Sequence, residues 1–200
     1  MKKNLTLVAA AGMVVLALAS CSKKDQFVGT WQAMSPVNIS AGIPAASDAH
    51  SLTSVTFGAQ GDVMLSSIIN ATQPVYENYG ALQGYEVSVA ATATVKGKWA
   101  YVPGEDDDLV LTFDQNSLNV DVDSNGVTFR QNMTDGEQQP VTDSLTAATV
   151  AIWKQQFTSA MRNEIMRYSR LDDVKTTKDG QTLKFEIENP EQDLVFRRVE

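Results

Sequence analysis

The sequence predicts a mainly β protein with one long helix, in which antiparallel strands follow one another as a meander and form a barrel, a half-barrel or a sandwich. Three observations support this prediction. Apolar side chains occupy every second position over residues 85–101, which is the period of a half-buried strand. Shorter alternating runs lie on both sides, separated by turn-forming residues. Residues 145–170 instead place apolar side chains every three or four positions, as one face of a helix does.

The first part of the chain predicts three strands. Residues 27–34 form the first, and residues 52–57 and 62–69 form a pair around a glycine-containing turn. Residues 36–50 are rich in Ala, Ser and Pro and are predicted as a loop, although Val37 and Ile39 extend the strand edge. Residues 72–84 are also predicted as a loop.

The alternating run over 85–101 is unusually long for one strand. At about 3.3 Å per residue it spans roughly 56 Å, which exceeds a flat strand in a domain of this size. We therefore expect a bend or a bulge, and Gly97 is the favoured position because glycine is typical of such sites.

Alternation returns after an acidic loop. Residues 109–113 and 118–122 are predicted strands, and Asn125-Gly126 predicts a tight hairpin that leads into a returning strand over 127–133. Two closing strands are predicted at 183–187 and 194–199, which gives about nine strands in all.

The helix prediction depends on one apolar stripe. Asp143 or Ser144 is the expected N-cap, because short polar side chains accept hydrogen bonds from the first turn. The stripe consists of Val150, Trp153, Phe157, Met161, Ile165 and Tyr168.

The first 20 residues have the features of a secretory signal peptide, with Lys2 and Lys3 before an apolar run over 5–18. That run is shorter than the roughly 20 apolar residues of a spanning helix. Cys21 follows directly and is the only cysteine, so an exported domain has no disulfide and depends on its core.

The tetrapeptide Leu18-Ala19-Ser20-Cys21 resembles the lipobox of bacterial lipoproteins. The resemblance implies cleavage before Cys21, fatty acylation of this residue, and a lipidated tether over 21–26. Several acyl chains hold a protein on a bilayer far more firmly than one. Because Ser22 is not acidic, the resemblance also implies attachment to the outer membrane, with the domain on the periplasmic or the cell-surface side.

The segment Gly29-Thr30-Trp31 resembles the opening strand of lipocalins, and more closely that of lipocalin-like lipoproteins of Gram-negative bacteria. Residues 96–99 resemble the second Gly-x-Trp of such proteins, and residues 194–199 resemble their last strand. The resemblance implies a lipocalin-like domain over 27–200. It also implies that Trp31 closes one barrel end, with Arg197 or Arg198 over its ring.

Composition excludes one class of partner. The chain has 24 Asp and Glu against 16 Lys and Arg, a formal net charge of −8, and the acidic excess lies before Val150. An acidic surface repels phosphate backbones, so nucleic acid is not an expected partner.

No constellation in the sequence predicts catalysis or a cofactor. His50 is the only histidine and falls in the predicted polar loop, and no Gly-x-Ser-x-Gly motif is present. Zinc sites made of Cys and His are excluded by count. Carboxylates are too numerous for any glycosidase pair to be singled out.

Two acidic segments are weak calcium candidates. Asp121, Asp123 and Asn125 match the first half of an EF-hand loop, but its twelfth position is Asn132 rather than Glu. A plain hairpin explains the same residues. Asp106, Asp107 and Asp108 are explained by a solvated loop or a protected strand edge.

The expected function is non-catalytic binding of a small apolar or amphipathic ligand by an outer-membrane lipoprotein. The alternative is an envelope interaction or assembly protein with a solid core, which binds a protein or a glycan by its surface. Ala91 and Ala93 either leave room for a ligand or let the helix approach closely. The candidate ligand-lining residues are Val89, Ala91, Ala93, Trp99, Trp153 and Phe157.

Overall fold

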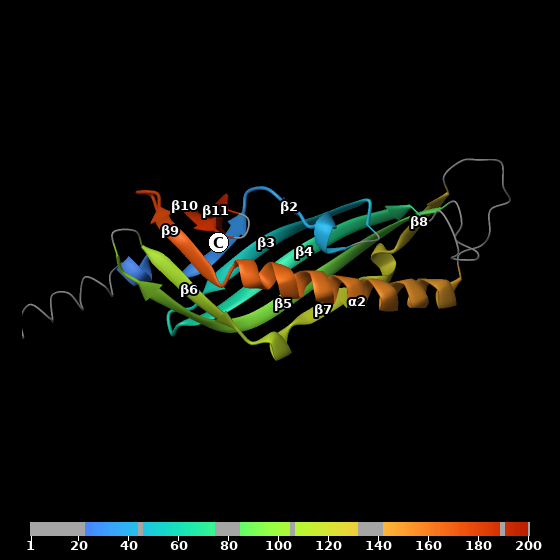
Figure 1. The fold of residues 1–200 in the computed structure, drawn as a ribbon, viewed down its shortest axis with the longest axis horizontal. Coiled ribbons are helices and arrows are strands. Elements are labelled where there is room, and N and C mark those ends of the chain that lie inside the picture. The colour runs from blue at the N-terminus through green and yellow to red at the C-terminus, as the bar shows by residue number, and fades with distance from the viewer. Residues whose placement is uncertain are drawn as a thin grey trace, which may run out of the picture.

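A computed structural model describes residues 23–43, 46–74, 85–104, 107–131, 142–188 and 191–199. This part of the chain contains eleven strands, one long helix and short 3-10 turns (Figure 1). The helix is α2 (Asp143–Arg167). The strands are β1 (Gly29–Ala33), β2 (Val37–Asn38), β3 (Asp48–Phe57), β4 (Asp62–Pro74), β5 (Tyr85–Val102), β6 (Asp108–Phe113), β7 (Asn119–Val122), β8 (Thr128–Gln131), β9 (Arg170–Thr176), β10 (Thr182–Ile187) and β11 (Gln192–Val199).

Eight of the strands close into an antiparallel barrel, which confirms the predicted fold class. The order around the barrel is β1, β11, β10, β9, β6, β5, β4 and β3. β1 then pairs with β3, from Gly29 opposite Phe57 to Gln32 opposite Ser54, and completes the circle. The result is a lipocalin-like barrel with one long helix.

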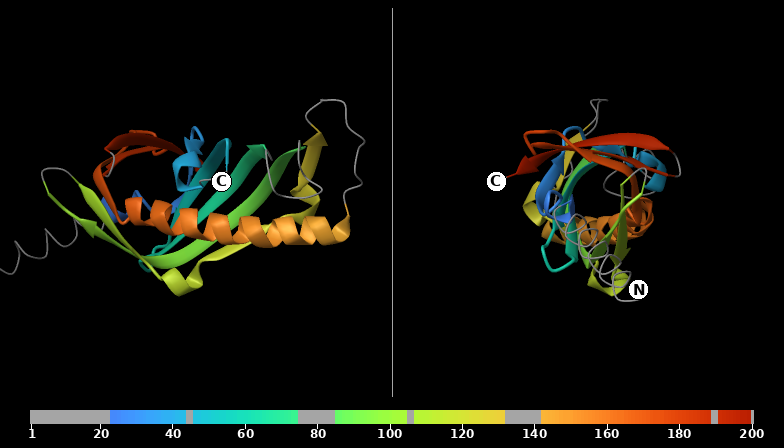
Figure 2. Two further views of the ribbon diagram at one scale, coloured as in Figure 1. Left: turned by 45° about the vertical axis from the view of Figure 1, so that its right-hand side comes forward. Right: turned by 90° about the vertical axis from the view of Figure 1, so that its left-hand side faces the viewer.

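The sheet continues beyond the barrel on one side. The last part of β5 pairs with β6 inside the barrel, whereas its first part pairs with β7 and β8. β3, β4 and β5 therefore extend past the barrel mouth, and α2 runs along this extension (Figures 1 and 2). We call this part, with β7, β8 and α2, the helix-covered half. The opposite end of the barrel, where the turn over 58–61 and the segment 23–28 lie, is the closed end.

β5 bends, as one of the two alternatives predicted, but it has no bulge at Gly97. The register of β5 with β4 runs without interruption from Lys98 opposite Asp62 to Glu86 opposite Pro74. β5 instead curves over its whole length (Figure 1). Gly97 serves a close approach between strands, because a Cβ there would lie 2.3 Å from the carbonyl oxygen of Thr112 on β6.

The predicted hairpin at Asn125-Gly126 is wrong. β7 and β8 do not pair with each other but lie end to end along β5, both antiparallel to it. A tight type I′ turn needs positive φ at both central residues, and neither residue has it. Asp123 accepts a hydrogen bond from the backbone N–H of Asn125 at 2.9 Å, which forms a 3-10 turn over Ser124–Gly126 instead.

The helix agrees with its predicted stripe, but its N-cap differs. The Thr142 side chain accepts a hydrogen bond from the backbone N–H of Leu145 at 3.3 Å, so neither Asp143 nor Ser144 is the cap. Of the stripe, only Val150 is not fully buried. The buried residues of α2 are Thr149, Trp153, Phe157, Ala160, Met161, Glu164 and Ile165.

Two further differences follow from weak alternation. β9 is missing from the prediction because it buries only Leu171 and Val174, with Asp173 between them at a φ of 51°. β3 begins at Asp48, so His50 lies in a strand and not in a loop. The buried positions Ser51 and Thr53 are polar and the outward Leu52 is apolar, which concealed the alternation.

Large aromatic side chains fill the barrel. Phe185 and Phe196 pack with ring centroids 5.0 Å apart, and Tyr168 contacts Phe185 at 6.5 Å. At the closed end, Phe57 and Trp99 meet edge to face at 5.1 Å. Aromatic side chains of this size bury large apolar areas.

Candidate functional site

The closed end is organised around Trp31 and Arg198. Trp31 is fully buried, and its Nε1–H donates to the carbonyl of Phe27 at 2.7 Å. The Arg198 guanidinium lies 4.2 Å from the centroid of the Trp31 ring, in a cation–π arrangement. It also donates hydrogen bonds to the backbone oxygens of Gln26, Val28 and Gly180.

The alternation of β11 selects Arg198 over Arg197. Leu194, Phe196 and Arg198 share the inner face, whereas Arg197 is exposed. Gly29 makes room for the guanidinium, since a Cβ on this residue would lie 2.5 Å from Arg198 Nη1. Its φ of 131° is also one that a residue with a side chain rarely adopts. The Gly-x-Trp spacing therefore has a physical reason in this chain.

Residues 23–26 of the expected tether are held against the closed end. Lys23 Nζ lies 3.1 Å from Asp107 Oδ2, and the Lys24 ammonium lies 4.9 Å from the centroid of the Trp99 ring. Gln26 accepts a hydrogen bond from Thr176 at 2.8 Å through its side-chain oxygen. These residues are part of the domain rather than a free linker.

Five of the six candidate ligand-lining residues lie between β5 and α2. Val89, Ala91 and Ala93 are buried on the inner face of β5. Trp153 and Phe157 are buried on α2, with ring centroids 5.1 Å apart. α2 contacts both β5 and its neighbour β7, so the helix covers the small side chains closely.

The sixth candidate, Trp99, lies elsewhere. It is buried at the closed end, where its Nε1–H donates to the carbonyl of Gly58 at 2.9 Å. β5 is long enough to contribute to both ends of the molecule, so a shared face does not imply a shared site. The structure does not bring Trp99 together with the other five.

Two surface pockets border α2. One, of about 330 Å³, lies between α2 and the 3-10 turn Ser40–Gly42 and is lined by Gly42, Ile152, Gln155, Gln156 and Ser159. Ile152 is 40% exposed there, and the side-chain oxygen of Gln156 is buried without a hydrogen-bond partner. The other, of about 420 Å³, lies at the C-terminal end of α2.

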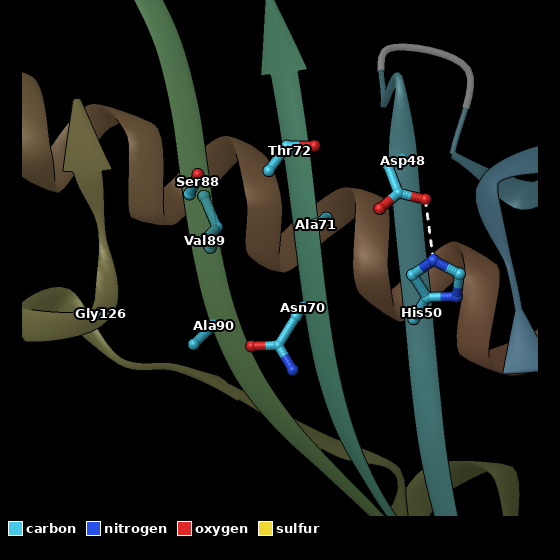
Figure 3. Close-up of a pocket in the computed structure, with 9 residues that line it drawn as sticks. All are labelled: Asp48, His50, Asn70, Ala71, Thr72, Ser88, Val89, Ala90 and Gly126. Carbon is cyan, nitrogen blue, oxygen red and sulfur yellow. Dashed lines mark ion pairs between the residues drawn. The ribbon is translucent and has the colours of Figure 1, made fainter. Parts of the chain in front are cut away.

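A third pocket, of about 160 Å³, opens on the outer face of the sheet (Figure 3). His50 Nε2 lies 2.9 Å from Asp48 Oδ1 on β3. The pocket's hydroxyl groups belong to Thr72 on β4 and Ser88 on β5, and Asn70 projects near the centre of the view. Among the described contacts, neither hydroxyl is hydrogen-bonded to His50.

Sequence reasoning missed a group of polar side chains inside the molecule. The signal was present, because inward positions of β3 run from Phe57 and Val55 back to Thr53 and Ser51. We call the group the waist cluster, since it lies where the barrel passes into the helix-covered half. It consists of Ser51, Thr53, Ser67, Glu164 and Tyr168.

The acidic candidates for calcium have other partners. Asp123 caps its own turn, Asp107 accepts a hydrogen bond from Tyr101 at 2.6 Å, and Asp108 pairs with Arg170 at 2.6 Å. Asp121 points outward from β7. Over the described ranges, no group of three or more His, Cys, Asp or Glu residues is placed to hold a metal ion.

The predicted signal peptide over 1–20, Cys21 and Asp106 lie outside the described residues. Within the part that the structure describes, no helix combines the length and the hydropathy needed to cross a bilayer. Fold and geometry define the class as a lipocalin-like barrel with a helix-covered extension. No protein-family model matches the chain, and no curated protein is significantly similar to it.

Proposed function

We propose that this protein is a non-catalytic envelope lipoprotein that binds a small apolar or amphipathic ligand in its helix-covered half. The observation that supports the proposal is that a single helix covers an inner sheet face of small and aliphatic side chains. Its buried aromatic residues Trp153 and Phe157 occupy the place a ligand would take. The small inner side chains are Ala49, Ala71, Ala91 and Ala93.

Ligand entry in this proposal needs α2 to move away from the sheet. The pocket beside Gly42 and Ile152 lies on the line where the helix would part from the turn Ser40–Gly42. Apolar pockets with a few polar groups are the usual sites for such ligands. The unpartnered oxygen of Gln156 would be such a group at the entrance.

A disulfide that fixes α2 tests this proposal directly. A Cβ on Gly42 would lie 3.4 Å from the Cβ of Ala160 on α2, which is close to the Cβ separation in disulfides. The double variant Gly42→Cys, Ala160→Cys should therefore form a bond when oxidised. We expect native mass spectrometry of the lipoprotein, released in mild detergent, to find an apolar adduct in the wild type and in the reduced variant.

The oxidised variant should carry little or no adduct. The reduced form of the same protein is the matched control, because it has the same composition and a free helix. Absence of an adduct from all forms, after gentle purification, would reject the ligand-binding proposal. Equal adduct in the oxidised and reduced forms would reject the entry route under α2.

The membrane anchor is a separate part of the proposal. It is supported by the lipobox resemblance and by the position of residues 23–26 at an outer surface of the domain. Cys21→Ala should remove the protein from the membrane fraction. If this variant still sediments with membranes after a high-salt wash, the anchor proposal is wrong.

A second candidate function is surface binding of a protein or glycan by a solid domain. The outer face of β4 and β5 supports it, because it carries uncharged side chains at Ser66, Ile68, Thr92 and Thr94, and Ile68 is 50% exposed. Uncharged sheet faces avoid the cost of desolvating ions on contact. Ile68→Glu should abolish partner capture in this case and leave any ligand adduct unchanged.

A further inference from the structure

The waist cluster lies on two neighbouring strands and at the end of α2. Thr53 on β3 pairs with Ser67 on β4, and Ser67 pairs with Ala93 on β5. Ser51 is two residues from Thr53 on the same inner face. All three hydroxyl residues are 2% exposed or less, and the helix adds Glu164 at 7% and, just after its end, Tyr168 at 0%.

The cluster is only partly satisfied by the protein. Thr53 Oγ1 lies 3.1 Å from Ser67 Oγ and 3.4 Å from Ser51 Oγ, which links the three hydroxyls in a chain. The Tyr168 hydroxyl is fully buried, and the Thr53 side chain lies close enough to lower its pKa. Within the described residues, however, no hydrogen bond of acceptable geometry reaches this hydroxyl. A buried polar group left in this state costs about 1–3 kcal/mol. A further polar group at this point would remove the cost.

Two alanines lie among the polar side chains. Ala93 completes the row of Thr53 and Ser67, and the next row consists of Ser51, Ile69 and Ala91. Towards the closed end, the corresponding inner positions carry Val55 and larger residues. The row of Thr53, Ser67 and Ala93 therefore has smaller side chains than the row on its closed-end side. This combination is typical of a position that accommodates the polar end of a guest molecule.

The charges at the cluster select a neutral head group. Burial, and after it the charge of Glu164, raise the pKa of Tyr168, whereas Thr53 and Arg167 lower it by less, so the phenol stays protonated. The nearby cation, Arg167, is already engaged by Glu164 at 3.1 Å and by Gln192 at 3.0 Å. A carboxylate would face Glu164 without a free counter-charge, and an ammonium would face Arg167.

We propose that the waist cluster receives the neutral, hydrogen-bonding head of an amphipathic guest, such as a primary alcohol, while its alkyl tail lies under α2. This inference rests on the proposed function and specifies its ligand class. The Tyr168 hydroxyl and the hydroxyls of Thr53 and Ser67 would bond the head group. A hydroxyl guest can both donate and accept, as these partners require.

The test uses the full-length protein in lipid nanodiscs and three photoreactive alkyl probes of equal length. One carries an alcohol and one a carboxylate, each with a diazirine next to the head group; the third is an alkane with the diazirine in its chain. We expect the alcohol probe to label peptides of β3, β4 or the end of α2. The carboxylate should label them about tenfold less, the ratio that one hydrogen bond commonly supplies.

Tyr168→Phe and Thr53→Val should each reduce labelling by the alcohol about tenfold and leave labelling by the alkane unchanged. Tyr168→Phe should also melt at or above the wild-type temperature, because it removes an unpartnered hydroxyl. The matched controls are Tyr101→Phe, whose hydroxyl is bonded to Asp107, and Thr92→Val on the outer face. Both should keep alcohol labelling at the wild-type level.

The outcomes separate the two proposals. If the alkane labels the helix-covered half but the alcohol shows no preference, or if Tyr168→Phe labels normally, the head-group site is wrong and the ligand-binding function stands. A clear loss of thermal stability in Tyr168→Phe would indicate a hydroxyl already satisfied, for instance by water, and would also overturn the head-group site. If no probe labels the interior, both proposals fail.

Discussion

The closed end and the helix-covered half are built from the same long strands, but they differ in how fully specific contacts hold their side chains in place. At the closed end, Trp31 is fixed by a cation above its ring and by its own hydrogen bond. In the helix-covered half, one helix lies over alanines and hydroxyls, and Tyr168 keeps an unpartnered group. The comparison predicts that the closed end contributes more to stability than the helix-covered half, which under the proposed function changes on binding.

The largest expected effect is at the centre of the closed end. Trp31→Ala should lower the free energy of unfolding by about 3–5 kcal/mol, because it removes a large, fully buried side chain. Urea denaturation followed by circular dichroism measures it. Met34→Ala is the control, since Met34 is 61% exposed and its loss should change stability by about 0.5 kcal/mol or less. Similar values for the two variants would refute the contrast between the regions.

The second effect isolates the cation. Arg198→Ala should lower the free energy of unfolding by about 2–4 kcal/mol, because the variant loses the contact with Trp31 and leaves backbone carbonyls without their charged donor. Arg197→Ala changes the same kind of side chain on the exposed face of β11 and should stay within about 0.5 kcal/mol. If the two arginines prove equivalent in denaturation, then Arg198 does not close the barrel energetically.

The third effect sharpens the comparison from the other side. Ala91→Leu adds volume beneath α2 and should destabilise the protein by about 1–3 kcal/mol. Thr92→Leu, its exposed neighbour on the outer face, should be close to neutral. A neutral or stabilising Ala91→Leu would mean that an empty space exists under the helix before any guest enters. Thermal denaturation of the two variants distinguishes these results.

The smallest effect appears at alkaline pH. Burial, followed by the hydrogen bond and the charge of Asp107, raises the pKa of Tyr101 to about 12. The pKa of tyrosine in an unfolded chain is about 10, so the folded state retains the proton of Tyr101 to a higher pH. The resulting contribution to the free energy of unfolding is fully present below the pKa of the unfolded state, and it is lost as the pH rises towards the pKa of the folded state. The stability difference between wild type and Tyr101→Phe should therefore shrink over that interval, and a constant difference would contradict the assignment.

Much of the fold could be predicted because its strongest patterns are local. The alternation of β5 and the stripe of α2 each arise from residues close in sequence, and both were right. The hairpin prediction at Asn125-Gly126 was wrong because a hairpin and an Asx-capped 3-10 turn use the same residue types. Only the pairing with β5 decides between them. β9 was missed because Asp173 interrupts its pattern.

The site was harder to predict because it depends on distant residues. Trp99 shares a strand face with Ala93, but the length of β5 separates their surroundings. By its spacing Tyr168 is one more residue of the helix stripe, and the polar surroundings of its hydroxyl are evident only once the fold places Thr53 beside it. The alternation along a strand indicates which side chains point inward, but not which of them contact one another.

The contacts that hold residues 23–26 against the barrel limit how far Cys21 can lie from it. Lys23 Nζ lies 3.1 Å from Asp107 Oδ2, and only Ser22 separates Lys23 from Cys21, so at most about 7 Å of chain joins these two residues. If Cys21 carries the proposed lipid, the domain would sit with its closed end close to the bilayer. The far end of α2, at the opposite side of the molecule (Figure 1), would then point into the aqueous space, where a partner that delivers or removes a guest would have to meet it.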